Sequence, residues 1–260
     1  MEASAQLQQL RRNPTAAQQL RDELLKGYPE SPVTVRVWAG VADHLFREEK
    51  FSAAVAIYQK LGKSLPPAST QLFAIAQVLL ESDGDPAKLL PIANQALAQN
   101  NLRFAKPLYK RLAKSPKAGA ALPQIETQLG WCIYLEGRDE ALRQAERLWR
   151  GVISRTKPAD PWYAESRWHL VQLAAGPEGN WSKAVALCQE IAREQAPGTF
   201  AQEQALFARA WLLTVHKQWK PAVAAFDDLA AAYPEKLLHP PVQRYRELAL
   251  QGPQTGKGMP

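Results

Sequence analysis

Small, aromatic and aliphatic residues recur at the same spacing in three stretches of the chain. The stretches align on the alanines that open three Ala-Val-Ala triplets, Ala54, Ala184 and Ala222. Each copy has an aromatic residue three positions earlier and larger, mostly apolar residues four and seven positions later. These residues are Phe51, Tyr58 and Leu61, then Trp181, Cys188 and Ile191, then Trp219, Phe226 and Leu229. Apolar residues three and four positions apart predict an amphipathic helix in each copy.

A second apolar segment precedes each triplet at a constant distance. It has a large residue sixteen positions before the triplet and, four positions later, a small residue in two copies but a glutamine in one. These pairs are Trp38 and Ala42, Trp168 and Gln172, and Leu206 and Ala210. Pro66 and Pro234 close two of the copies, because proline has no amide hydrogen with which to continue a helix. We therefore expect antiparallel helix pairs over residues 35–66, 168–195 and 204–234.

This spacing resembles the tetratricopeptide repeat (TPR), a helix–turn–helix unit of about 34 residues. In that family a small residue in each helix lets the two helices of a pair cross closely, as Ala42 and Ala54 would here. The resemblance implies an all-α fold, an α-α superhelix in which antiparallel helix pairs stack as a solenoid. It also implies a protein-interaction scaffold, because the family binds partner segments in a concave groove lined by the first helix of each pair.

Looser copies of the pattern lie between the clear ones. Residues 129–134 resemble the middle of a first helix, and residues 145–149 resemble its partner. Residues 71–82 and 86–100 read as another pair. Residues 101–120 read as an atypical insert with an extra helix at its centre, because the segment fits no repeat cleanly.

These copies together predict the domain organisation. Because each repeat of a solenoid buries its apolar face on its neighbours, the length of 260 residues sets no limit on a single array. We expect one TPR-like domain over residues 1–250. The last ten residues, 251–260, contain Gly, Pro and Lys and almost no apolar side chain, which predicts a disordered tail.

The resemblance also assigns a candidate groove. Counting along the repeats places aromatic and arginine side chains on the groove face, namely Arg36, Phe46, Arg47, Trp131, Tyr134, Phe207 and Trp211. Some family members hold a peptide C-terminus with Lys and Asn at positions that here are Ala39 and Asp43, so that clamp is absent. Trp, Tyr and Arg dominate interface energetics, which favours a binding groove. The alternative is that Trp131 and Trp211 pack between neighbouring helices.

Positive charge is concentrated in one part of the chain. The net charge is +7, and residues 86–125 contain no Asp or Glu. Four basic residues there are spaced three and four apart and so share one helix face, which we call the basic stripe: Arg103, Lys106, Lys110 and Lys114. The stripe is either a solvated face or a surface that attracts phosphates or an acidic partner. It lacks the interleaved aromatic residues that stack on single-stranded bases.

No motif in the chain indicates catalysis. The four histidines stand in separate segments without metal-ligand spacing, and no nucleophile elbow or phosphate-binding loop occurs. We expect no enzyme activity, no cofactor and no metal. Cys132 and Cys188 fall in different predicted helices, and we expect both to be free thiols.

Two functions remain open from the sequence. The first is a scaffold that binds another protein or peptide in the groove, and the second is a basic adaptor that docks on nucleic acid or another polyanion through residues 103–117. No apolar run is long enough to span a membrane, so no membrane span is expected. Residues 1–13 are polar and Gln-rich, unlike a signal peptide, which favours a cytoplasmic location. A periplasmic or exported protein whose leader had been removed would give the same sequence.

Overall fold

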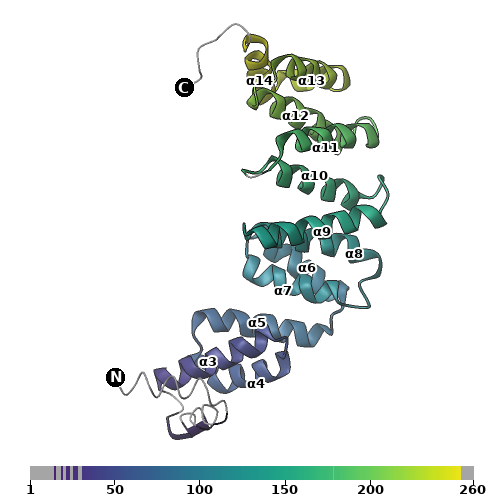
Figure 1. Ribbon diagram of the computed structural model, residues 1–260. Coiled ribbons are helices and arrows are strands. Elements are labelled where there is room, and N and C mark those ends of the chain that lie inside the picture. The colour runs from purple at the N-terminus through teal and green to yellow at the C-terminus, as the bar shows by residue number, and fades with distance from the viewer. Residues whose placement is uncertain are drawn as a thin grey trace. The chain divides into compact units, whose positions relative to one another are not determined.

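The computed structural model describes residues 31–177 and 179–252, together with residues 15, 19, 22, 23 and 26–28. These residues form α-helices joined by short turns and 3-10 segments, with no β-strand among them (Figure 1). The fold is therefore all-α, as predicted, and its helices pack as antiparallel pairs like those of the TPR. Residues 253–260, most of the tail predicted to be disordered, lie outside the described part of the chain.

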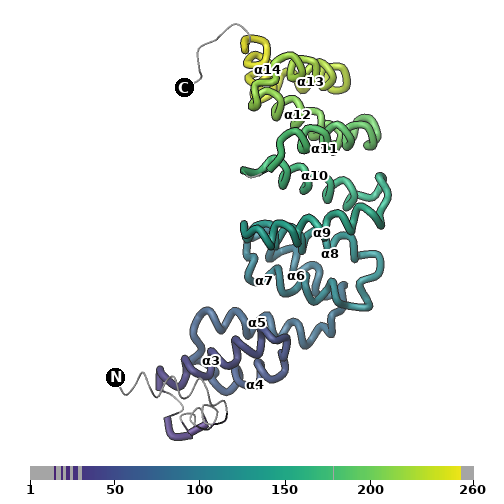
Figure 2. Tube along the Cα trace, in the orientation of Figure 1, coloured from purple at the N-terminus to yellow at the C-terminus, as the bar shows by residue number. Residues whose placement is uncertain are grey.

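The helices cluster into two compact units, residues 1–119 and 120–260, which we call unit 1 and unit 2. Unit 1 contains α3 (Pro32–Arg47), α4 (Phe51–Leu61), α5 (Pro67–Ser82), α6 (Pro86–Ala98) and α7 (Leu102–Ala113), with the 3-10 segment η1 (Gly62–Ser64) (Figure 2). The pair α3/α4 packs against α5, and α6 pairs with α7.

Unit 2 contains three successive helix pairs. They are α8 (Leu122–Tyr134) with α9 (Asp139–Arg155), α10 (Pro161–Ala175) with α11 (Trp181–Glu194), and α12 (Phe200–Val215) with α13 (Trp219–Ala232). The 3-10 segments η2 (Gly119–Ala121) and η3 (Pro234–Leu238) precede α8 and the final helix α14 (Pro240–Gln251). The first helices pack on one another in sequence, α8 on α10, α10 on α12, and α12 on α14, so they form one continuous face of this unit.

The segment expected to be an insert is instead half of a regular repeat. Helix α6 packs mainly on α7 and only slightly on α5, so the predicted pairing of 71–82 with 86–100 is wrong. The turn between α6 and α7 has a left-handed residue, Asn100, at its centre, as do the α3–α4 turn at Glu49 and the α12–α13 turn at Lys217. These three turns thus share a left-handed residue at the same position.

A fourth copy of the repeat is therefore present in unit 1. Aligned on Ala105, it has the same positions filled as the copies at Ala54 and Ala222: Leu89, Ala93, Leu102, Tyr109 and Leu112. Ala93 and Ala105 are fully buried, as the crossing of two helices requires. The Tyr109 hydroxyl donates to Asn94 Oδ1 at 2.7 Å, and the equivalent Tyr58 hydroxyl donates to Asp43 Oδ1 at 2.7 Å.

The first helices begin earlier than the repeat pattern predicts. Helices α3, α10 and α12 start at residues 32, 161 and 200 rather than near 35, 168 and 204. In each case a polar side chain caps the helix: Ser31, Asp160 and Thr199 accept hydrogen bonds from backbone amides of the first turn. Capping residues, rather than the repeat motif, thus decide where these helices begin.

The α10–α11 turn displaces one residue that the pattern placed in the core. This turn spans residues 176–180, two residues longer than the turns at 48–50 and 216–218. Trp168 is consequently only partly buried, whereas Trp38 and Leu206, which stand at the same sequence distance from their triplets, are buried.

Candidate binding surfaces

The three groove residues of unit 1 do not form one exposed surface. Arg36 and Arg47 are exposed on α3, and their Nε atoms donate to the backbone oxygens of Pro32 at 3.2 Å and Asp43 at 3.1 Å. Phe46 is buried, with its ring edge-on to Phe51 at a centroid distance of 5.4 Å. The Asp43 carboxylate has a structural role, because the hydroxyls of Tyr58 and Ser69 both donate hydrogen bonds to it.

The four groove residues of unit 2 lie on the face formed by the first helices and are all partly buried. Trp131 stacks on Tyr134 at a centroid distance of 5.2 Å. Trp211 meets Tyr245 of α14 edge-on at 6.4 Å, and Phe207 packs against the buried cluster around Phe226 and Leu229. Each ring is therefore partly packed against neighbouring helices and partly exposed. The structure combines the two alternatives from the sequence, a groove surface and packing between helices.

A buried histidine lies at the centre of the aromatic cluster on α8, α9 and α10. His169 stacks between Trp131 at 4.6 Å and Trp149 at 4.9 Å, measured between ring centroids. Its Nδ1 is hydrogen-bonded to Gln172 Oε1 at 2.8 Å, whereas Nε2 makes no hydrogen bond and lies 3.4 Å from a carboxylate oxygen of Glu165. Burial lowers the pKa of His169 below its ordinary value of 6.5, although Glu165 acts in the opposite direction.

Unit 2 is expected to lose stability as the pH falls below 6.5, and His169 is expected to contribute to that loss. The pKa of His169 is lowered in the folded state and has its ordinary value in the unfolded state. Below pH 6.5 the unfolded state therefore binds more protons than the folded state does. The stabilisation is complete above this pH and declines toward the lower folded-state pKa. Urea unfolding of the chain and of His169→Phe between pH 7.5 and 5.5 measures it. Equal pH slopes for the two proteins would contradict the assignment.

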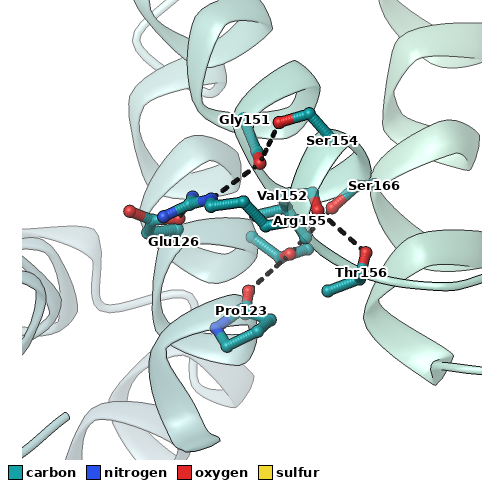
Figure 3. A network of polar contacts seen from close by, with 9 residues as sticks. Pro123, Glu126, Gly151, Val152, Ser154, Arg155, Thr156 and Ser166 are labelled. Carbon is teal, nitrogen blue, oxygen red and sulfur yellow. Dashed lines mark hydrogen bonds and ion pairs between the residues drawn. The ribbon is translucent and has the colours of Figure 1, made fainter. Parts of the chain in front are cut away.

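Polar contacts fix the three helices around this cluster to one another (Figure 3). Thr127 on α8 donates to the backbone oxygen of Pro123 and shares a 2.8 Å hydrogen bond with Ser166 on α10. Arg155 at the end of α9 forms an ion pair with Glu126 of α8, and its Nε donates to Gly151 O at 2.9 Å. Polar contacts thus join α8, α9 and α10 to one another.

A hollow of unit 2 lies between α10 and α12, and we call it the α10–α12 cleft. Its volume is about 670 Å³. The floor and walls come from the first turns of α10 and α12 and the end of α11: Pro158, Ala159, Asp160, Pro161, Ala164, Glu165, Trp168, Ile191, Glu194, Gln195, Ala196, Thr199, Phe200, Ala201 and Gln204. Neither Trp168 nor Phe200 belongs to the groove predicted from the sequence.

The α10–α12 cleft is apolar at its base and acidic at its rim. Asp160, Glu165 and Glu194 line it, and no Lys or Arg does among the described residues. Glu194 and its neighbour Glu190 both pair with Arg167, which is buried on α10, and the Tyr163 hydroxyl donates to Glu194 at 2.8 Å. With two carboxylates on one buried guanidinium, the rim keeps an excess of negative charge.

A second hollow of about 240 Å³ adjoins this cleft on the other side of α12, and we call it the α12–α14 hollow. Phe200 and Gln204 line both hollows, and Phe207 lines the second. Phe200 is 73% exposed, an unusual state for a phenylalanine, and it stands on the ridge between the two. The two hollows thus follow the row of first helices from α10 to α14.

The basic stripe has a partner that its own sequence neighbourhood lacks. Arg103, Lys110 and Lys114 are exposed on α7 and Lys106 is partly buried, while Leu108 and Leu112 on the opposite face are fully buried. Glu49, in the α3–α4 turn, approaches Lys114 at 2.7 Å and Lys110 at 3.2 Å. These ion pairs lower the pKa of Glu49. Although residues 86–125 contain no Asp or Glu, a distant segment thus supplies a carboxylate to the stripe.

The described residues contain no group of three or more His, Cys, Asp or Glu side chains placed to hold a metal ion. Cys132 and Cys188 are free and buried, and burial raises the pKa of the Cys188 thiol to about 12. Among the helices that the structure describes, none has the length and apolar character needed to cross a bilayer.

Among known proteins, this chain shows similarity in structure but not in sequence. No family model matches the chain, and no curated protein matches it in sequence. A solved structure, that of a tetratricopeptide repeat protein from Parabacteroides merdae ATCC 43184, is similar over 88% of this chain and 90% of that chain, with 13% sequence identity and a TM-score of 0.43.

Proposed function

We propose that this chain is a protein-interaction scaffold, and that unit 2 binds a segment of a partner protein along α10, α12 and α14. The observation that carries the proposal is Phe200, which is 73% exposed on a ridge between two adjoining hollows. A large aromatic side chain kept in water is unfavourable unless something covers it, and aromatic residues dominate the energetics of protein interfaces.

The lining of the α10–α12 cleft favours a particular kind of segment. Trp168 and Ile191 supply an apolar base for one or two apolar side chains of the partner. Asp160, Glu165 and Glu194 at the rim favour a neighbouring Lys or Arg, since complementary charge steers association and selects among partners. The ligand that fits is an extended segment in which apolar and basic residues alternate.

Phe200 offers a cleaner test than the groove residues predicted from the sequence. Trp131 and Trp211 bury part of their rings, so that replacing either would change stability together with binding. Phe200→Ser is expected to reduce capture of the bound protein from source-cell lysate by about tenfold or more, the loss typical of an interface hot spot. The melting temperature should stay nearly unchanged, because the ring is exposed.

A matched control is available in unit 1. Val33 is also exposed, at 55%, but lies far from these hollows in the sequence, on α3. Quantitative mass spectrometry of proteins captured by the wild type, Phe200→Ser and Val33→Ser should show one or more proteins lost only with Phe200→Ser. If Phe200→Ser and Trp168→Ala both capture the same proteins as the wild type, the proposed surface is not the binding site.

A further inference from the structure

A small pocket in unit 1 brings together two features that stand far apart in the sequence. It lies where the α3–α4 turn faces α7, has a volume of about 190 Å³, and we call it the α3–α7 pocket. Two predicted groove residues and two residues of the basic stripe line it with four others: Phe46, Arg47, Glu49, Phe51, Lys106, Pro107, Lys110 and Arg111. The sequence assigned the two groove residues and the two stripe residues to separate sites.

The α3–α7 pocket combines an apolar interior with a basic rim. Phe46, Phe51 and Pro107 supply the apolar surface, and the two rings hold each other edge-on at 5.4 Å. Four basic side chains and one carboxylate complete the lining, a formal net charge of +3. At this size the pocket admits one side chain, since sites for drug-sized ligands occupy about 300–1,000 Å³.

The carboxylate of Glu49 shows which chemistry this rim attracts. It accepts from Lys114 at 2.7 Å and lies 3.2 Å from Lys110. Glu49 has a left-handed backbone, with φ of 62°, at the centre of the α3–α4 turn, so the turn fixes the position of its side chain beside α7. The rim has this one carboxylate against four basic side chains, so an excess of positive charge remains to attract the carboxylates of a ligand.

We propose that the α3–α7 pocket binds an acidic segment of a partner protein, with one bulky apolar side chain inserted and flanking carboxylates on the basic rim. Charge complementarity selects the occupant, because apolar filling alone would not require four cations around the opening. The inference does not rest on the unit 2 surface, whose acidic rim selects the opposite charge. The two units would then hold two chemically different segments.

Nucleic acid fits this surface less well than an acidic peptide does. Stacking of single-stranded bases needs a row of exposed aromatic rings, whereas Phe46 is buried and Tyr109 is fully buried with its hydroxyl on Asn94. Arg103, the first residue of the basic stripe, does not line the pocket. A polyanion would contact Arg103 together with the rest of the stripe, whereas a peptide seated in the pocket would not. Substituting this arginine therefore distinguishes nucleic acid from a peptide as the ligand.

Three probes of equal negative charge test the proposal on the full chain by fluorescence anisotropy. The first is a short peptide of glutamates with one central phenylalanine, the second has serine in place of the phenylalanine, and the third is a single-stranded oligonucleotide. We expect the phenylalanine peptide to bind about tenfold more tightly than the serine peptide, in line with burial of one aromatic side chain. The oligonucleotide should bind no better than the serine peptide.

Two substitutions of exposed or half-exposed residues are expected to change binding in opposite directions, and a third serves as the control. Arg47→Glu should weaken the phenylalanine peptide by about tenfold, by placing a like charge on the rim. Glu49→Gln should strengthen it, because Lys110 and Lys114 lose their internal carboxylate. Arg103→Glu is the control, because Arg103 belongs to the basic stripe but does not line the pocket, and it should change peptide binding little. Far-ultraviolet circular dichroism of each variant confirms that the helices remain.

Other results would overturn the proposal. Equal affinities for the two peptides would mean that the pocket takes no side chain. Tighter binding of the oligonucleotide, weakened as much by Arg103→Glu as by Arg47→Glu, would assign the stripe to nucleic acid. Absence of binding by all three probes at low ionic strength would make the basic rim a solvated surface.

Discussion

Replacing Trp149 with alanine is expected to lower the free energy of unfolding of unit 2 by about 3–5 kcal/mol, the range for truncating a buried tryptophan. The ring is fully buried, and its Nε1 donates to the backbone oxygen of Thr127 at 3.1 Å. It also stacks on His169 and packs against Tyr134. Removing it opens a cavity where α8, α9 and α10 meet and leaves Thr127 O without this donor.

Tryptophan fluorescence during urea unfolding measures this loss in the right part of the chain, because seven of the eight tryptophans lie in unit 2. Trp131→Ala is the matched control. Trp131 stacks on the other side of the same histidine, but it is only partly buried, so the loss should be clearly smaller. Equal losses at the two positions would show that burial does not distinguish the rings.

Adding a single methyl group at Gly130 should destabilise the same helix crossing from the other side. A Cβ at this position would lie 2.6 Å from Trp149 Nε1 and 3.0 Å from Cε2. Because the indole is fully buried and hydrogen-bonded, it cannot swing away, and α8 and α9 must separate. We expect Gly130→Ala to cost about 1–3 kcal/mol, the usual range for overpacking, and Gly130→Val to cost more.

Gly151 on the facing helix provides a control of opposite sign. A Cβ there would meet only the end of the Arg155 side chain, at 3.5 Å. Gly151→Ala should therefore stabilise the protein by about 0.5–1 kcal/mol, since glycine in a helix interior is less favourable than alanine by that amount. If both glycines respond alike, the close approach of α8 and α9 at Gly130 is not real. Thermal melts of the two variants decide this.

The helical class and the helix pairs at Ala54, Ala184 and Ala222 could be predicted from the sequence, because close helix crossings require small residues at fixed spacing. The copy at Ala105 was missed for a local reason. Its triplet reads Ala-Lys-Pro, and Leu102 stands where the others have an aromatic residue. The buried positions are nevertheless the same, which shows that the crossing and the turn define the repeat more strongly than its exposed residues do.

Less of the candidate sites could be predicted, and the reasons are physical. Phe200 is the first residue of α12, directly after the Thr199 cap, and a count that starts the helix at 204 leaves it in a turn. The capping residue Thr199 is the sequence signal that places Phe200 within the helix. The approach of Glu49 to Lys114 joins residues 65 positions apart, and no local pattern encodes such a contact.

The two thiols give unit 2 a kinetic reporter that unit 1 lacks. Cys132 and Cys188 are the only cysteines of the chain, and both lie on buried faces of helices in unit 2. A thiol with a pKa of about 12 is almost entirely protonated at neutral pH and is shielded from reagents, so alkylation of Cys188 must wait until its helix opens. The rate of labelling therefore follows the local opening of one half of the molecule, without any engineered probe, while the other half stays silent.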